Sequence, residues 1–176
     1  MRYTTVKTAW GWVAAATGEH GLLALVLPHA AEEEAVNALF ARVGTASVGP
    51  DPTAFGDLPD RLVAYFRGER VSFAADAIDW TGTTLFQREV LSAVRQIPYG
   101  EVRSYKWVAQ CINRSRAFQA VGQALKANRL PVIIPCHRVI YQAGDLGGFR
   151  EGHALKEHLL TLEGVTKASL TREAAV

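Results

Sequence analysis

Cysteine is almost absent from this chain. Only two of its 176 residues are cysteines, Cys111 and Cys136, and neither belongs to a CxxC or CxH pattern. A disulfide framework or a cysteine-rich zinc site needs more thiols at closer spacing. The sequence therefore argues against both, and we expect two reduced thiols, no metal and no cofactor.

Long apolar runs are also missing. No uninterrupted hydrophobic stretch approaches the roughly 18 residues needed to span a bilayer, and residues 1–12 lack the apolar core of a signal peptide. With 49% hydrophobic and 20% charged residues, the composition is that of a folded domain. We therefore expect no membrane partner and a cytoplasmic location.

Acidic residues are scarce in one part of the chain. Residues 95–150 hold nine lysines and arginines against two acids, whereas residues 1–94 hold seven against eleven and residues 151–176 three against four. A basic stretch in an otherwise acidic protein is typical of a surface that binds a polyanion such as nucleic acid. The alternative is an ordinary solvated surface.

The pattern of the chain predicts an α+β (mixed α/β) protein with a small N-terminal lobe of sheet and helix over residues 1–79. Alternation between Tyr3 and Leu27 predicts strands, with a hairpin turn at Gly18–Gly21, and Pro28 is expected to end the second strand. Beyond it we expect a helix, a loop, a second helix and a short strand, over residues 30–43, 44–57, 59–67 and 71–75 respectively.

A mainly helical C-terminal lobe is predicted over residues 80–170, followed by a flexible tail at 171–176. A first helix is expected over residues 84–96. Ser104 can cap a helix to Ile112, Asn113 suits a left-handed turn, and Ser115 can cap a helix reaching Lys126. These features predict a helix-turn-helix over about 104–127, although helical hairpins that merely pack have the same pattern.

The second of these helices is rich in small residues. Ala117, Ala120, Gly122 and Ala124 recur along it, and a glycine inside a helix costs about 1 kcal/mol relative to alanine. Such residues permit another backbone to approach closely. That neighbour is either a second helix or the backbone of a nucleic acid.

Cys136 stands beside His137 in the run PCHRV, at the end of a predicted buried strand, 132–134. A buried cysteine is usually a small hydrophobe, and chemistry requires the thiolate, which a neighbouring base can generate. Neighbouring side chains of an extended segment point to opposite faces, so we do not expect His137 to touch the Cys136 sulfur directly unless the chain turns, and a bridging water could link the two groups. The pair is also compatible with a cysteine hydrolase.

Several ordered motifs between Phe86 and Glu163 give the chain a family resemblance. They are IPYGEVRSY (97–105), AVGQAL (120–125), Asn128, IPCHRV (134–139), GGF (147–149) and LKEHLLTLE (155–163). This region resembles the DNA-binding domain of O6-alkylguanine-DNA alkyltransferases. The resemblance implies a ribonuclease-H-like N-terminal lobe and a monomeric DNA-repair protein, associated with the nucleoid in a bacterial or archaeal host.

The implied activity is that of a methylated-DNA–[protein]-cysteine S-methyltransferase. Such a protein binds double-stranded DNA through the minor groove with its helix-turn-helix and rotates the damaged base out of the stack. It then moves the alkyl group of O6-alkylguanine, and by extension of O4-alkylthymine, irreversibly onto its own cysteine, here Cys136. A non-catalytic alkyltransferase-like lesion sensor is the alternative, but such proteins typically replace the cysteine that this chain keeps.

Site residues follow from the resemblance residue by residue. Glu163 would orient His137, Asn128 would tie the helix pair to the cysteine loop, and Tyr105 would disturb the DNA backbone and return a proton to the base. Without the resemblance, Glu163 is a helix-end acid, Asn128 a helix cap and Tyr105 a packing residue. The catalytic set is Cys136, His137, Glu163 and Asn128, and the set binding DNA or the alkylated base is Tyr105, Gln119, Ala117, Ala120, Gly122, Lys126, Arg138, Val139 and Phe149.

Three positions depart from the family pattern. Gln119 stands where an arginine usually fills the gap left by the flipped base, and glutamine is shorter and uncharged. Arg129 replaces a usual proline, and Glu151 replaces a usual glycine in the loop near the substrate, where it could repel phosphate or pair with Arg150. These changes bear on how the base is extruded, which costs a few kcal/mol.

Overall fold

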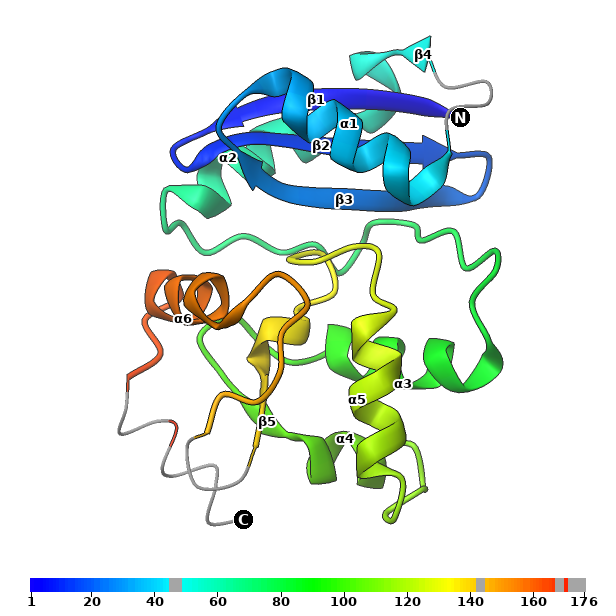
Figure 1. Cartoon of the computed structure of the whole chain (residues 1–176), viewed down its shortest axis with the longest axis vertical. Helices are drawn as coiled ribbons and strands as arrows, with labels where there is room; N and C mark the ends of the chain where they lie inside the picture. The colour runs from blue at the N-terminus through cyan, green and yellow to red at the C-terminus, as the bar shows by residue number, and fades with distance from the viewer. Residues whose placement is uncertain (45–48, 142–144, 167–169, 171–176) are drawn as a thin grey trace. The chain divides into compact units, whose positions relative to one another are not determined.

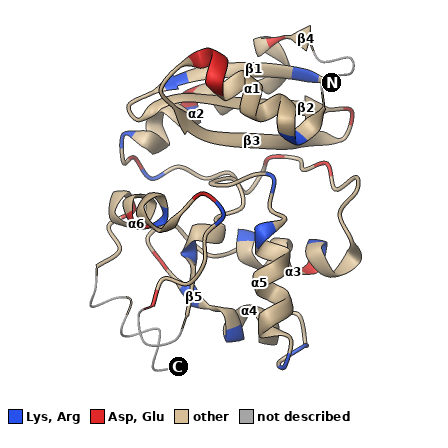
Figure 2. Ribbon diagram, in the orientation of Figure 1, with Lys and Arg blue, Asp and Glu red and all other residues tan. Residues whose placement is uncertain are grey.

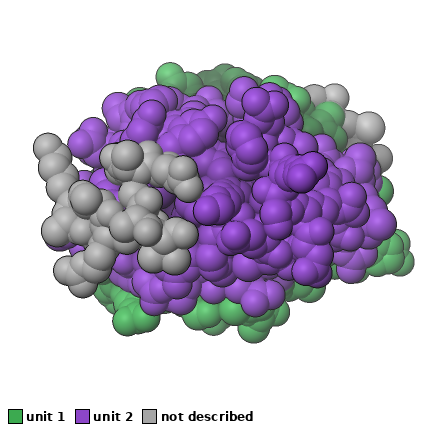
Figure 3. Space-filling view, turned by 90° about the horizontal axis from the view of Figure 1, so that it is seen from below, with its two compact units in different colours: residues 1–81, 129–131 green, residues 82–128, 132–176 purple. Residues whose placement is uncertain are grey.

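The computed structural model describes residues 1–44, 49–141, 145–166 and 170. The chain forms two compact units, one made of Met1–Thr81 with Arg129–Pro131 and the other of Gly82–Asn128 with Val132–Val176 (Figure 3). The predicted tail 171–176 lies outside the described residues. Within the described part of the chain, no helix has the length and apolar character that crossing a membrane requires.

The first unit contains a four-stranded mixed sheet (Figure 1). Its strands are β1 (Arg2–Thr8), β2 (Gly11–Gly18), β3 (Gly21–His29) and β4 (Gly49–Pro50), in the order β3-β2-β1-β4. β1 and β2 pair antiparallel, as do β2 and β3, whereas β4 runs parallel to β1. The predicted hairpin turn is confirmed, with Gly18 paired to Gly21.

Helix α1 (Glu32–Val43) covers one face of this sheet (Figure 1). Its buried residues Ala35 and Leu39 pack against small and β-branched residues of β2 and β3, among them Ala14, Ala16, Ala24 and Val26. The alanines let the helix backbone approach the sheet closely. The acids Glu32–Glu34 occupy the first turn, where they favour the helix dipole. Helix α2 spans Leu58–Phe66.

Two expectations for the first unit were wrong. β3 continues through Pro28 because its register with β2 shifts between Trp12 and Ala14, and such an irregularity accommodates a proline. No strand forms over residues 71–75. Instead the Arg61 guanidinium donates to the Ser72 carbonyl oxygen at 3.0 Å and to the Asp76 carboxylate at 2.6 Å, which holds the segment in turns.

The segment 44–57, expected as a loop, contains β4 and a short 3-10 helix at Pro52–Phe55. The segment Arg129–Pro131 also belongs to this unit, although it is distant in sequence. The N–H of Leu25 in β3 donates to the Arg129 carbonyl oxygen at 2.8 Å. The sheet therefore fixes the backbone three residues before the apolar stretch that leads to Cys136.

The second unit consists of helices around a minimal sheet. Helix α3 spans Leu85–Arg95, and Thr84 and Gln87 form the capping box at its start. The helices α4 (Tyr105–Cys111), α5 (Phe118–Lys126) and α6 (His153–Leu162) follow. Two-residue strands β5 (Arg103–Ser104) and β6 (Val139–Ile140) pair in parallel.

The connection between α4 and α5 differs from the prediction in one respect. Ser104 caps α4, accepting from the Trp107 N–H at 3.0 Å, and Asn113 has φ 56°, as expected. Ser115, however, caps nothing, and α5 begins three residues later at Phe118. The Ala117 N–H donates to the Arg114 carbonyl oxygen at 2.8 Å, so residues 114–117 form a separate turn.

The apolar stretch before Cys136 is also not a strand. Val132 has φ 72°, a conformation that is rare for a β-branched residue and costs about 1–3 kcal/mol. The chain turns there and then forms a 3-10 helix at Cys136–Arg138, called η2 here, before entering β6. Cys136 and His137 therefore do not point to opposite sides of an extended segment.

The left-handed turn at Asn113 gives a test of the α4–α5 connection. Asn113→Val should lower the free energy of unfolding by about 1–2 kcal/mol because a β-branched side chain clashes at positive φ, whereas Asn113→Gly should be close to neutral. Urea denaturation of the full chain measures both. Asn113 is exposed, so a difference in packing would not distinguish valine from glycine at this position. Equal effects of the two substitutions would therefore contradict the left-handed conformation of Asn113.

Candidate active site

Cys136 is the first residue of η2 and is 8% exposed. Asn128, two residues beyond the end of α5, donates from Nδ2 to the Cys136 Sγ at 3.1 Å and to the Ile134 carbonyl oxygen at 2.9 Å. Burial raises the pKa of the Cys136 thiol to about 11, although the Asn128 hydrogen bond acts in the opposite direction. The group is therefore a protonated thiol at neutral pH and needs a base to become a nucleophile.

His137 and Glu163 form a buried pair beside this thiol. The two side chains are wholly inaccessible, and His137 Nε2 lies 2.8 Å from Glu163 Oε1. Burial lowers the pKa of His137 despite the opposing contact with Glu163, so the imidazole is neutral at pH 7. A neutral ring that donates from Nε2 to the carboxylate presents Nδ1 as its basic atom.

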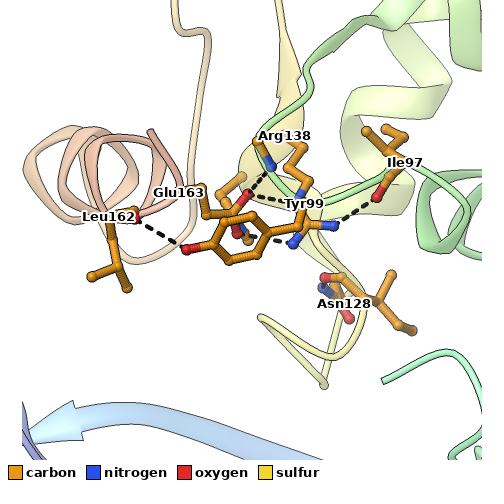
Figure 4. A network of polar contacts seen from close by, with 9 residues as sticks. Ile97, Tyr99, Asn128, Arg138, Leu162 and Glu163 are labelled. Atoms are coloured by element: carbon orange, nitrogen blue, oxygen red, sulfur yellow. Dashed lines mark hydrogen bonds and ion pairs between the residues drawn. The ribbon is translucent and has the colours of Figure 1, made fainter. Parts of the chain in front are cut away.

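Arg138 completes a fork around the same carboxylate (Figure 4). Its Nε donates to Glu163 Oε2 at 2.8 Å and its Nη2 to Oε1 at 2.9 Å, while Nη1 donates to the Ile97 carbonyl oxygen at 2.6 Å. Burial alone would raise the pKa of Glu163, but hydrogen bonds and charges from His137 and Arg138 outweigh it and hold that pKa well below its usual range.

The loop before β5 closes the network from the other side. The Gly100 N–H donates to Glu163 Oε2 at 3.1 Å, and the Tyr99 hydroxyl donates to the Leu162 carbonyl oxygen at the same distance. The Arg138 guanidinium lies 5.8 Å from the centre of the Tyr99 ring, within range of a cation–π contact (Figure 4). The end of α6, this loop and η2 are thus held by one carboxylate.

The location of Arg138 differs from the expected one. The sequence suggested a DNA contact, but the residue is only 7% exposed and its guanidinium is turned inward to Glu163 and Ile97. A buried charge of this kind is retained where it is fully paired. Arg138 therefore holds the carboxylate rather than presenting its charge to a ligand.

Lys156 is a residue that sequence reasoning missed. It is completely buried in α6, and its Nζ donates to the Val139 carbonyl oxygen at 2.6 Å and to that of Leu146. Burial lowers its pKa to about 8. The positive charge also lowers the pKa of Cys136, whereas the charge of Glu151 raises it. The sequence contains a signal for this burial, because positions 156, 159, 160 and 163 share one helix face. The other three positions hold two leucines and Glu163.

Tyr105 lies at the start of α4 in an aromatic pocket. Its ring centre is 4.8 Å from that of Tyr141, and its hydroxyl donates to the Gly148 carbonyl oxygen at 3.4 Å. Gly147 has φ 66°, and a Cβ there would lie 2.7 Å from Tyr141 and 3.1 Å from Tyr105, so only glycine fits. Burial is the main cause that raises the pKa of Tyr105 to about 12. The pocket has a volume of about 560 Å³ and is lined by Ser104, Tyr105, Lys106, Ser115, Phe118, Tyr141 and Asp145.

The residues expected to contact DNA are distributed over α5 and the following loops. Gln119, Ala120 and Lys126 are exposed, and Ala117, Gly122 and Phe149 are half-buried. Residues 104–127 contain no acid, and Figure 2 shows basic positions on α4, on the turn after it and at the end of α5. Val139 is fully buried.

Gly122 has no crowding neighbour of its own. A Cβ at this position would meet one atom, Cε1 of Tyr105, at an ordinary contact distance of 3.7 Å. The described residues therefore give no internal steric reason for glycine in α5. In the same part of the chain, no group of three or more His, Cys, Asp or Glu side chains could hold a metal ion.

Known proteins resemble both the sequence and the fold. The family model for the 6-O-methylguanine DNA methyltransferase DNA-binding domain matches residues 85–165. The methylated-DNA–protein-cysteine methyltransferase of Mycobacterium tuberculosis is 46% identical over 114 residues, which cover 65% of this chain and 68% of that protein. The protein of the same name from Sulfolobus acidocaldarius is 35% identical over 170 residues, which cover 97% of both chains.

Solved structures agree with these relatives. The crystal structure of Mycobacterium tuberculosis OGT in complex with DNA matches with a TM-score of 0.77 and 34% identity, covering 97% of this chain and 99% of that one. The O6-methylguanine-DNA methyltransferase of Pyrococcus kodakaraensis has a TM-score of 0.70 at 21% identity, covering 93% of this chain and 99% of that one, which shows a common fold. The α+β class expected from the sequence is confirmed.

The buried carboxylate gives a pH-dependent prediction. At pH 7, Glu163→Gln should lower the free energy of unfolding by about 3–5 kcal/mol because the Arg138 charge stays buried without its counter-ion. The depressed pKa of Glu163 means that its stabilisation is complete above about pH 4.3, the unfolded value, and is lost as the pH falls below it.

Urea denaturation at pH 7, 5 and 3 tests this expectation. The difference in the free energy of unfolding between wild type and Glu163→Gln should be smaller at pH 3 than at pH 7. The control Glu157→Gln, an exposed change on the same helix, should have the free energy of unfolding of the wild type at every pH. A wild-type-to-variant difference that stays constant from pH 7 to pH 3 would mean that the carboxylate is not held ionised by its partners.

Proposed function

The chain belongs to the family of methylated-DNA–protein-cysteine methyltransferases, and we propose that Cys136 is the residue that accepts the alkyl group. The protein transfers the alkyl group of O6-alkylguanine in DNA to one of its own cysteines, and DNA is its partner. The observation that carries the assignment to Cys136 is its setting: a thiol that accepts a hydrogen bond from Asn128 beside a buried histidine–carboxylate pair.

The transfer is a displacement at carbon. Sγ attacks the alkyl carbon, the S–C bond forms as the C–O6 bond breaks, and the bonding electron pair stays on the guanine. The thiol proton passes through a water to Nδ1 of His137, and the guanine anion takes up one proton. The products are a thioether and an unmodified base, so each molecule reacts once.

The polar network supports this sequence of proton transfers. Glu163 fixes the ring of His137 through Nε2 and stabilises the imidazolium that forms, as the carboxylate of a catalytic triad does. Arg138 keeps that carboxylate ionised and in place, so we assign it a positioning role rather than a DNA contact. Lys156 favours the developing thiolate by its charge.

Tyr105 is proposed as the donor that returns a proton to the departing base. Its ring is held between Tyr141 and Gly147, and burial, which raises its pKa to about 12, leaves the hydroxyl protonated at neutral pH. Val139 and Phe149 would form the apolar wall for the alkyl group. By extension from the family, we include O4-alkylthymine in the proposal.

The finer structural assignments remain proposals as well. The sheet order β3-β2-β1-β4, with β4 parallel to β1, supports a ribonuclease-H-like first unit covering about residues 1–79. The acid-free α4–α5 pair supports a helix-turn-helix within a DNA-binding and alkyl-acceptor domain over residues 80–170. We further propose that a monomer acts in the cytoplasm or on the nucleoid and reads duplex DNA through the minor groove, with the damaged base flipped out.

A lesion sensor without transfer activity is the second candidate. It would use the same DNA surface but would need no nucleophile. The retention of the thiol, the Asn128 donor and the His137–Glu163 pair favours transfer.

Intact-mass measurement separates the two candidates. Incubation with a duplex containing O6-methylguanine should add one methylene, about 14 Da by elementary composition, and peptide mapping should place it on Cys136. Cys136→Ser should bind the duplex and gain no mass, and Cys111→Ser should react like wild type. Binding by the wild-type protein without a mass gain would replace the enzyme with the sensor.

A further inference from the structure

Phe118 is an exposed aromatic residue at the first position of α5. Its exposure is 47%, and among the described residues only Met1, Leu85 and Tyr141 are other large hydrophobic residues with comparable or greater exposure. Single exposed apolar residues are common and need no explanation by themselves. Phe118 differs because of what lies around it.

Two of these exposed residues, Phe118 and Tyr141, line the same pocket as Tyr105. Tyr141 stacks on Tyr105, whereas Phe118 stands one helical turn before Gly122, on the same face of α5. The space above Gly122 is open apart from the edge of Tyr105. Phe118 therefore lines the pocket of the proposed proton donor, beside a backbone that another molecule can approach.

The charges around Phe118 are those of a phosphate-binding surface. Lys106, Arg116 and Lys126 are exposed on α4, on the turn before Phe118 and at the end of α5. Among the described residues that line the pocket, Asp145 is the one acid. It would repel phosphates from its own side, so the DNA backbone is expected on the side of Lys106 and Arg116.

Presenting a base to Cys136 requires that the base leave the stack, and the gap that it leaves must be filled. Proteins that unstack DNA commonly insert an apolar side chain such as phenylalanine between bases. Gln119 can hydrogen-bond to an orphaned base, but its amide has no broad apolar face with which to replace a stacked base. Its neighbour Phe118 has such a face and is already exposed.

We propose that Phe118 is the wedge that enters the base stack and holds the target nucleotide outside the helix, with Gln119 in a supporting role. The inference rests on the proposed function, since it specifies how that function gains access to its base. Phe118 is thus a positioning residue: it acts on the duplex and takes no part in the displacement at Cys136.

The experiment compares Phe118→Ala with Leu85→Ala, an exposed change at the start of α3 that lies outside the pocket. Single-turnover alkyl transfer is measured with O6-methylguanine in a duplex and in the same strand unpaired. Phe118→Ala should slow transfer from the duplex at least tenfold and from the single strand less than twofold. Leu85→Ala should match wild type on both, and Phe118→Trp should keep most of the duplex rate.

Gln119→Ala tests the competing assignment, in which Gln119 is the wedge. This variant lacks the Gln119 amide and keeps the Phe118 ring. It should slow the duplex reaction less than Phe118→Ala does. A loss from Gln119→Ala that equals or exceeds that of Phe118→Ala would give the wedge to Gln119. Equal losses from duplex and single strand in Phe118→Ala would likewise overturn the proposal.

A second measurement does not depend on transfer. The fluorescence of 2-aminopurine rises when the base is unstacked. In a duplex with 2-aminopurine beside O6-methylguanine, binding of the Cys136→Ser variant should therefore raise the fluorescence of the probe. The double variant Cys136→Ser/Phe118→Ala should give less than half of that rise, and an undiminished rise would overturn the wedge. If the wild-type protein transfers no alkyl group to itself, the proposed function fails, and this fluorescence comparison still decides the role of Phe118.

Discussion

The buried carboxylate of Glu163 is the constraint on which the rest of the second unit depends. It accepts hydrogen bonds from His137, from Arg138 and from the Gly100 backbone, and so joins three segments that are distant in sequence. An ion pair in such a place adds little stability over apolar residues of the same shape, but it tolerates only one arrangement of its donors. The carboxylate thereby fixes which nitrogen of His137 is basic, which is a chemical requirement rather than a structural one.

The surroundings of Cys136 favour the thiol over the thiolate, because burial outweighs the groups that lower its pKa. Burial favours the thiol, Asn128 and Lys156 favour the thiolate, and Glu151 opposes them. A cysteine that can react only once gains nothing from being ionised in the absence of substrate, since a standing thiolate would be alkylated or oxidised by other reagents. Its proton can be removed where a base of the right geometry and an alkylated substrate are both present.

The parts of the fold that could be predicted were those with a local cause. The Gly18–Gly21 turn, the Ser104 cap and the left-handed Asn113 each follow from the chemistry of one or two residues. The wrong expectations had non-local causes. The Arg61 side chain holds residues 72–76 in turns, and the surrounding structure imposes a positive φ on Val132, a residue type that ordinarily favours strands.

The same distinction holds for the candidate site. The family resemblance placed Cys136, His137, Glu163 and Asn128 in one constellation, and the structure brings them together. The resemblance could not reveal that Arg138 points inward, because the sequence PCHRV is the same whichever way that side chain points. Lys156 could have been found, since it occupies the apolar face of its own helix.

Residues Arg129–Pro131 belong to the first unit although the chain on both sides of them belongs to the second, so the two units cannot be separated by a single cut in the chain. The chain leaves the second unit after Asn128 and returns at Val132, so the backbone on either side of that excursion carries the hydrogen-bonding asparagine and the strained turn. A fragment cut at residue 82 would keep every reacting group but lose the β3 amide of Leu25 that anchors Arg129. The sheet of the first unit contributes no reacting atom, yet its hydrogen bond to Arg129 holds the backbone between the asparagine that binds the thiol and the strained turn.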